Sequence, residues 1–223
     1  MQRVRDKRGW GLVMDKDRLK KQIEFVVEID KLKSVYRQTL LMNGERNEND
    51  AEHSWHLGIM AILLSEYAFG DIDILRVLKM VLVHDLVEID AGDTFCYDEQ
   101  GARDKVEREK TASDRIFSIL PSDQAGEIRT LWEEFEAVSS PEARFAAAID
   151  RLHPLLHNYN TLGAAWQKHG VTSDKVLARN REIDDGAPEL WEYAEDLIRS
   201  AVENGYLASG EQVSAANVEI RPT

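Results

Sequence analysis

Apolar residues recur at steps of three and four positions along most of this chain, and that spacing constrains its fold more than any other feature. On an α-helix such spacing gathers the apolar side chains on one face, which then packs against neighbouring helices. No segment carries a convincing pair of β-strands. Because 223 residues are only somewhat more than the roughly 150 of a typical domain, the sequence predicts a single all-α domain.

Polar or glycine-containing segments separate the predicted helices. One of them, Asn43–Asp50, predicts a loop in which Asn49 or Asp50 caps the following helix. The predicted helices cover about residues 17–42 (one long helix or two with a bend), 50–69, 72–89, 103–120, 122–137, 141–159, 173–183 and 189–204.

The predicted domain covers residues 15–207. Residues 1–14 and 208–223 are expected to be loose termini, and the second of these is polar and short of large apolar groups. The segment Gly163–Thr172 predicts either a linking loop or a lid.

The chain is strongly acidic, with 28 Lys and Arg against 41 Asp and Glu and a net charge of -13. A surface of this sign repels phosphate backbones, so we expect no binding to nucleic acid. A small phosphorylated substrate remains compatible with this charge, because a metal ion and a few arginines can reverse the field inside a pocket.

The single cysteine, Cys96, excludes an internal disulfide, and the first residues lack the apolar segment of a signal peptide. The longest apolar run, Val77–Ile89, is shorter than the about 18 residues that span a bilayer and is interrupted by charged residues. We therefore expect a soluble, cytoplasmic protein that does not enter membranes.

Four ionisable residues stand where the helical spacing predicts buried positions: His53, His84, Asp85 and Asp150. An ionised Asp among apolar residues needs a cation or several hydrogen bonds. His84 and Asp85 are successive residues of a predicted helix and point about 100° apart, so both can reach one point beside it. Two imidazoles and two carboxylates suit Mn, Fe, Co, Ni or Zn better than Ca or Mg alone.

Other interpretations of the histidines stay open. A single buried His or Asp is more often a hydrogen-bonded structural residue than a ligand. His56 lies three residues after His53 and competes with it as a ligand by spacing. His153 and His157 also have a metal-binding spacing, but Pro154 between them would distort the turn, so we expect solvated or packing histidines there.

Two further carboxylates could overlook the same cavity. Glu88 is four residues after His84, on the same predicted helix face, and Asp93 follows the turn at Gly92. A carboxylate near a metal-bound water can orient the water, accept its proton or protonate a leaving group. The alternatives are an exposed helix-end charge for Glu88 and a turn role for Asp93.

Four motifs follow one another in the chain: AEHSW with His53, HDLVEIDAGD with His84 and Asp85, LWEEFE at 131–136, and AAIDRL with Asp150. In this order they resemble the HD-domain superfamily of metal-dependent phosphohydrolases, and more narrowly its 5'-deoxynucleotidase branch. The resemblance covers about residues 29–159. It implies an all-α bundle with a central apolar helix that carries the His-Asp pair.

The same resemblance implies one divalent metal (Mn, Co, Fe, Ni, Zn or Mg) held by His53, His84, Asp85 and Asp150, and His56 is then not a ligand. The implied reaction is hydrolysis of the 5'-phosphate of (deoxy)nucleoside monophosphates by a metal-activated water. Glu88 would handle the proton and Asp93 would contact the substrate or the water.

This chain departs from the nucleotidases near its N-terminus. They carry an Arg-Trp pair upstream of the first His, for phosphate and sugar contact, whereas the nearest match here is Arg37-Gln38 in VYRQT. Arg46 is a second candidate for the cation that binds phosphate. The absence of the Trp leaves the preference for deoxyribose open, and another phosphate ester is also possible as the substrate.

Two other functions remain as alternatives. An HD-type nucleoside triphosphohydrolase is the enzymatic one, and a non-catalytic helical protein with a structural metal site is the other. The chain has no His between Asp85 and Asp150, which favours one metal rather than two. A large apolar helical surface makes a homodimer possible.

Overall fold

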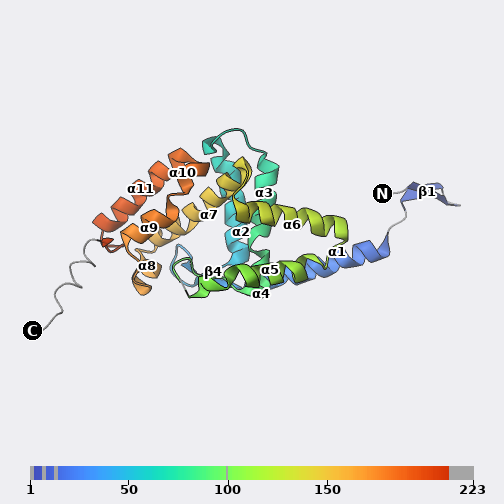
Figure 1. The fold of residues 1–223 in the computed structure, drawn as a ribbon, viewed down its shortest axis with the longest axis horizontal. Coiled ribbons are helices and arrows are strands. Elements are labelled where there is room, and N and C mark those ends of the chain that lie inside the picture. Colours follow the sequence, from blue (N-terminus) through green and yellow to red (C-terminus); the bar gives the residue numbers. More distant parts are fainter. Residues whose placement is uncertain (1–2, 7–8, 13–14, 99, 211–223) are drawn as a thin grey trace, which may run out of the picture.

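The computed structural model describes residues 3–6, 9–12, 15–98 and 100–210, and most of these lie in helices (Figure 1). The α-helices are α1 (Lys16–Glu28), α2 (Asp50–Leu64), α3 (Ile74–Val83), α4 (Glu88–Ala91), α5 (Lys105–Phe117), α6 (Ser122–Ala137), α7 (Pro141–Asn160), α8 (Ala164–Lys168), α9 (Ser173–Asn180), α10 (Ile183–Gly186) and α11 (Pro188–Glu203). Short 3-10 helices are η1 (Ile29–Ser34), η2 (Ser65–Tyr67), η3 (His84–Val87) and η4 (Gly101–Arg103). The strands are β1 (Arg3–Asp6), β2 (Gly9–Leu12), β3 (Tyr36–Leu40) and β4 (Asn47–Asn49). The all-α fold class is therefore confirmed.

Helix α7 runs through the middle of the bundle and packs against α2, α3, α6, α10 and α11 (Figure 1). Its side chains Phe145, Ile149 and Leu152 are almost completely buried. Helix α10 approaches α7 so closely that a Cβ atom on Gly186 would lie 2.2 Å from the carbonyl oxygen of Arg144. The apolar spacing thus produces a tightly packed bundle, and α7 carries Asp150 into its interior.

The predicted helix over residues 72–89 is divided into α3, η3 and α4. Helix α3 packs against α2, α6 and α7 with Met80 buried, while Leu82 on its other side is exposed. His84 and Asp85 lie in η3. Because a 3-10 helix has three residues per turn, their side chains point about 120° apart rather than about 100°.

The predicted helix over residues 17–42 ends earlier than expected. After η1 ends at Ser34, the chain enters β3, which pairs with β4 in antiparallel fashion. Tyr36 pairs with Asn49 and Leu40 with Asn47, so β3 contains two more residues than the part of β4 it faces, and it bulges. The prediction that no strands pair is wrong here, because pairing with a later segment overrides the local apolar spacing.

The two ends of the chain and the segment 163–172 were predicted to be loops or loose segments. Among residues 1–14, expected to be loose, β1 and β2 pair in antiparallel fashion. Residues 211–223 lie outside the described residues. The segment 163–172, predicted as a loop or a lid, contains α8, whose Trp166 is buried.

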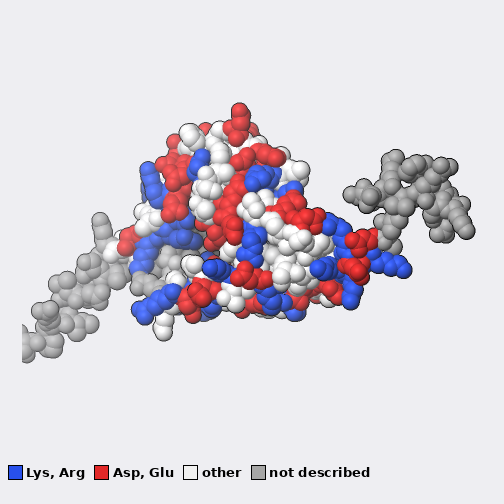
Figure 2. Space-filling view, turned by 45° about the vertical axis from the view of Figure 1, so that its right-hand side comes forward, with Lys and Arg blue, Asp and Glu red and all other residues white. Residues whose placement is uncertain are grey.

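Charges of both signs cover the described surface. On the face drawn in Figure 2, Lys and Arg side chains alternate with Asp and Glu side chains, and no broad basic area is visible on it. No helix among the described residues is both long enough and apolar enough to cross a lipid bilayer.

Candidate metal centre

The four predicted metal ligands come together from three elements. His53 lies on α2, His84 and Asp85 on η3, and Asp150 on α7. Asp150 Oδ1 is 2.9 Å from His53 Nε2 and 3.8 Å from His84 Nε2. Asp85 Oδ1 is 3.0 Å from His84 Nε2, and its Oδ2 is 3.8 Å from His53 Nε2. One ligand atom each of His53, His84 and Asp150 therefore lies within 4.8 Å of the others, although His53 and Asp150 are 97 residues apart. Asp85 contacts the two imidazoles beside them with its two different oxygens.

A capping box fixes the position of His53. The Asn49 side chain accepts a hydrogen bond from the backbone N–H of Glu52, whose carboxylate accepts one from the backbone N–H of Asn49. Of the two predicted caps, Asn49 is thus the one used. Helix α2 starts at the next residue, Asp50, so His53 lies near its N-terminal end. The side chain of His53 is completely buried.

The hydrogen bonds of His84 leave a lone pair directed at the carboxylates. Its Nδ1 lies 3.1 Å from the carbonyl oxygen of Val81, which can only accept, so Nδ1 carries a proton. Its Nε2 faces Asp85 and Asp150 and has no hydrogen-bond partner within the described part of the chain. A buried nitrogen that faces two carboxylates requires a proton or a cation, so this residue set fits a divalent metal ion.

The pKa values show how strongly this group attracts positive charge. Burial disfavours a charge on His84, but Asp85 and Asp150 outweigh it and raise its pKa to about 9. Burial also opposes ionisation of Asp85, yet His84 and Arg37 lower its pKa to about 2. Burial and Arg37 lower the pKa of His53 to about 4, which keeps this imidazole neutral. Without a metal, a proton on His84 therefore balances the carboxylates, and a metal ion would displace it.

Arg37 contacts the same carboxylates from the bulged strand β3. Its Nη1 lies 3.2 Å from Asp85 Oδ2 and 3.4 Å from Asp50 Oδ1. Asn47 donates a side-chain hydrogen bond to the carbonyl oxygen of Arg37 and so holds the bulge against β4. Burial disfavours the charge of Arg37, but Asp85 and the other carboxylates around it outweigh burial and raise its pKa.

A second acidic group lies next to these residues. Asp50, Glu88 and Asp93 each place one carboxylate oxygen within 4.8 Å of the others. Burial and the charge of Asp85 raise the pKa of Glu88 well above its ordinary value, and the same two causes raise that of Asp50 to about 7. Burial also raises the pKa of Asp93. Glu88 is only 6% exposed, so the alternative of a solvated helix-end charge is wrong.

One cavity connects these side chains. It is lined by Arg37, His84, Asp85, Glu88, Asp93 and Asp150. Three more cations, Lys105, Arg151 and Arg179, and four aromatic rings, Phe95, Tyr97, Phe135 and Trp166, also line it. The cavity thus combines a cluster able to hold a metal ion with positive charge and flat apolar surface.

Arg46 is not brought to this cavity. It lies on the surface, where Nη1 and Nη2 bind the two carboxylate oxygens of Glu52 at 2.8 and 2.6 Å. Its charge is thus engaged by the capping residue of α2.

Several buried residues near the site are not apparent from the sequence. Asp50 and Glu48 are buried carboxylates, yet they lie in the polar segment 43–50, which by itself indicates only a loop and a helix cap. His153 and His157 are buried as well, at 0% and 3% exposure, so they are not solvated. Their spacing of four residues places both on one face of α7, because the helix continues past the proline between them.

The sequence profile of the HD domain matches residues 29–191 of this chain. This is more than half of its length, and the chain belongs to the HD domain family. The family predicted from the four motifs is thereby confirmed.

Relatives with this domain include named enzymes. A Danio rerio protein named 5'-deoxynucleotidase HDDC2 is 32% identical over 143 residues, which make up 63% of this chain and 70% of the relative. A Schizosaccharomyces pombe protein named 5'-deoxynucleotidase hdd1 is 31% identical over 134 residues, 58% of this chain and 66% of the relative. The chain thus spans about two thirds of the length of these relatives.

Among solved structures, one from Magnetospirillum magnetotacticum is described as a "predicted metal-dependent phosphohydrolase". It is 53% identical and superposes with a TM-score of 0.84, covering 88% of this chain and 100% of that protein. A Pyrococcus horikoshii protein is 25% identical, with a TM-score of 0.57 over 82% of this chain and 99% of its own.

Proposed function

We propose that this chain is a metal-dependent phosphohydrolase that removes the 5'-phosphate from (deoxy)nucleoside monophosphates. The observation that carries the proposal is the buried group of His53, His84, Asp85 and Asp150 at a cavity that also presents arginine and aromatic side chains. The names of the deoxynucleotidase relatives support the substrate class.

These four residues would hold one divalent metal of the Mn, Co, Fe, Ni, Zn or Mg group. Such an ion supplies charge that polarises a phosphoryl oxygen and lowers the pKa of water. His84 and Asp150 would each give one side-chain atom, and the hydrogen bond from His84 to the carbonyl of Val81 would keep the imidazole oriented.

Glu88 is proposed to manage the proton of the reaction. Its buried position beside Asp50 and Asp93 favours the protonated carboxyl, which can donate to a leaving oxygen and afterwards take up the proton of the attacking water. Asp93, which also lines the cavity, is proposed to contact the substrate or the attacking water.

Arg37 is proposed to bind the phosphate. It lines the cavity, and its guanidinium lies beside Asp85 and Asp50 at the acidic end of that cavity. Phosphate is commonly bound by guanidinium groups because their N–H donors match its oxygen atoms. Arg46, which is engaged by Glu52 on the surface, is not proposed for this role.

A triphosphate substrate is the second candidate, since the structure adds an observation in its favour. Lys105, Arg151 and Arg179 line the cavity in addition to Arg37. Lys105 pairs with Glu109 and Arg151 with Glu182, so a nucleoside triphosphate would have to draw these cations away from carboxylates to use their charge.

A screen of phosphate release tests both candidates. The purified protein would be assayed with deoxy- and ribonucleoside monophosphates, triphosphates and a generic phosphomonoester, each with several divalent metals. We expect inorganic phosphate from monophosphates, and its loss in Asp150→Asn. The matched control is Asp196→Asn, because Asp196 lies on the surface of α11 beside Arg199. Release of pyrophosphate or triphosphate instead would favour a triphosphate substrate. If no compound releases phosphate in a metal-dependent way, the remaining interpretation is a non-catalytic protein with a structural metal site.

We also propose that the protein is a cytoplasmic homodimer. Trp55, Ile59, Ile62 and Leu63 are exposed large apolar residues on α2, which supports a contact between copies. Sedimentation analysis tests the dimer, and a monomer at all concentrations would refute it.

A further inference from the structure

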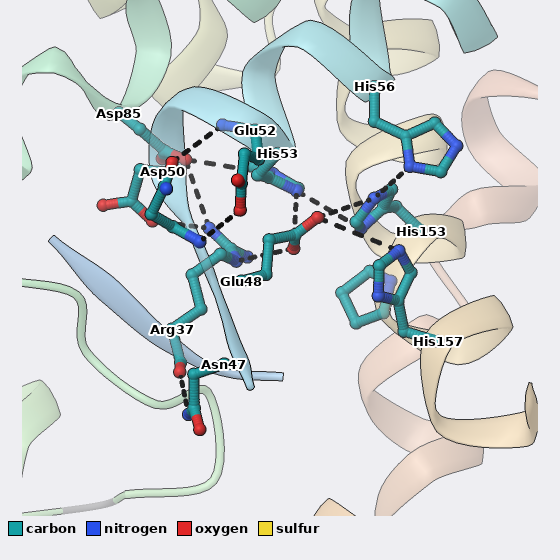
Figure 3. Close-up of polar contacts among 12 residues, drawn as sticks. Arg37, Asn47, Glu48, Asp50, Glu52, His53, His56, Asp85, His153 and His157 are labelled. Carbon is teal, nitrogen blue, oxygen red and sulfur yellow. Dashed lines mark hydrogen bonds and ion pairs between the residues drawn. The ribbon is translucent and has the colours of Figure 1, made fainter. Parts of the chain in front are cut away.

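A second group of histidines lies behind the predicted metal centre. Glu48 from β4, His56 from α2, and His153 and His157 from α7 point toward one another (Figure 3). One ligand atom from each of them lies within 4.8 Å of every other. Glu48, His153 and His157 are buried, and His56 is half-buried. We call these four residues the histidine–glutamate cluster.

The hydrogen bond of His157 fixes the direction of its lone pair. Its Nδ1 lies 2.8 Å from the carbonyl oxygen of Leu40 and donates to it. In the neutral ring Nε2 then bears the lone pair, and it lies 3.8 Å from Glu48 Oε1. Neither His157 Nε2 nor Glu48 Oε2 has a hydrogen-bond partner in the described structure. Two electron-rich groups thus face each other in a buried place, which is costly unless a cation or a proton lies between them.

The other members of the cluster complete a set of donors. His153 Nε2 lies 3.4 Å from Glu48 Oε1 and 3.0 Å from His56 Nδ1. Glu48 makes no hydrogen bond to Arg37, whose Nε is 3.8 Å from its Oε2. Three imidazoles and one carboxylate are the donor types that zinc and neighbouring transition metals prefer.

We propose that the histidine–glutamate cluster binds a divalent transition-metal ion of the zinc class, at a site separate from the one at His84 and Asp85. The half-buried ring of His56 gives the ion a way in from the surface. The hydrogen bond from His157 to Leu40 corresponds to the outer contact that usually orients a metal-binding histidine.

His53 links the two sites because each of its ring nitrogens faces one of them. Its Nε2 lies 2.9 Å from Asp150 Oδ1. Its Nδ1 lies 3.3 Å from Nδ1 of His153 (Figure 3). Only one proton fits between the two Nδ1 atoms. When His153 carries it, His153 Nε2 has a lone pair for the cluster, and when His53 carries it, His53 Nε2 has a lone pair for the other site.

Zinc content separates the two sites. Asp150→Ala removes a carboxylate from the predicted centre and leaves the cluster intact, so this full-length variant should keep about one zinc ion per chain after dialysis. Asp150→Ala/His157→Gln should lose it. Asp150→Ala/His169→Gln is the matched control and should keep it, because His169 packs on Phe95 and belongs to neither site. With Co²⁺ in place of Zn²⁺, a visible absorption band should be present in Asp150→Ala and in Asp150→Ala/His169→Gln. It should be absent in Asp150→Ala/His157→Gln.

A folding control keeps the result interpretable. Because His157→Gln also loses the hydrogen bond to Leu40, His56→Gln at a half-buried position provides a second variant, and circular dichroism verifies that each protein is folded. Unchanged zinc content when either histidine is replaced in the Asp150→Ala background would overturn the proposal, as would a folded Asp150→Ala protein that binds no zinc. Neither measurement depends on phosphate release, so failure of the proposed hydrolase function would be recognised separately.

Discussion

Replacing Glu48 by glutamine should stabilise the metal-free protein, and more strongly as the pH rises. Burial raises the pKa of Glu48 from 4.5 to about 8. Arg37 opposes this increase, and nearby carboxylates add to it. The folded protein then retains a proton that the unfolded chain releases, so stability falls as the pH rises from about 4.5 to about 8. Each pH unit within this range costs about 1.4 kcal/mol. Glutamine has no such proton to lose, and its amide can donate to the lone pair of His157.

The size of the effect follows from these pKa values. At pH 8 the ionisation of Glu48 costs roughly 4 kcal/mol, and at pH 5 less than about 1 kcal/mol. For a chain of this size, about 1 kcal/mol shifts Tm by about 2–4 °C. Glu48→Gln should therefore raise Tm by about 10 °C at pH 8 and by less than about 3 °C at pH 5.

Thermal unfolding followed by circular dichroism, with a chelator present, measures this difference. Glu192→Gln is the matched control, because Glu192 is exposed on α11 and its replacement should leave Tm unchanged at every pH. A Tm difference between wild type and Glu48→Gln that stays constant from pH 5 to pH 8, or that turns negative at pH 8, would refute the reasoning.

Three further variants test other parts of the structure. Glu88→Gln should keep the fold and the bound metal but lower turnover by about 10²- to 10⁴-fold, as expected for the loss of an acid-base group, and turnover near that of wild type would remove Glu88 from the mechanism. Arg37→Ala should mainly raise KM, as measured by steady-state kinetics on one phosphomonoester, and an unchanged KM would exclude it as the phosphate-binding cation. Gly186→Ala should destabilise the protein by about 1–3 kcal/mol in chemical denaturation, because its Cβ would clash with the backbone of Arg144, and wild-type stability would contradict the close packing of α10 on α7.

The sequence predicted the helical parts of the fold because their stability comes from apolar faces that the spacing of residues reveals. The N-terminus of α2 was also predictable, since the cap at Asn49 and the carboxylate of Glu52 act within four residues of each other. The break at η3 could not be predicted in the same way. Residues 72–89 are apolar on almost every side, and local spacing does not distinguish an α-helix from one that tightens into a 3-10 turn.

Strand β3 could not be predicted for a different reason. Val35 and Tyr36 continue the apolar spacing of α1, and the strand exists because β4 pairs with it across a turn. This pairing turns Arg37 toward Asp85, a contact between residues 48 positions apart that local sequence does not indicate. His84 and Asp85 were predictable as site residues, because ionisable side chains are costly to bury without a hydrogen-bond partner or a cation.

The buried histidines of α7 show where a local rule failed. Pro154 removes one backbone hydrogen bond, and this suggested a distorted turn with His153 and His157 either solvated or packed, of which only the packed alternative agrees with their burial. The helix nevertheless runs from Pro141 to Asn160, and Asn158 donates its side-chain amide to the carbonyl oxygen of Pro154 at 2.9 Å. Packing on both sides of a long helix outweighs one missing hydrogen bond.

His53, His84, Asp85 and Asp150 are proposed to hold the metal with which this chain hydrolyses phosphomonoesters. The most direct test removes all metal with a chelator and measures phosphate release from a deoxynucleoside monophosphate as Mn²⁺ or Co²⁺ is added back. Wild-type protein and the surface control Asp196→Asn should regain activity as metal is added, whereas His84→Ala should not. Phosphate release that survives complete metal removal, or that metal restores equally in His84→Ala, would contradict the account.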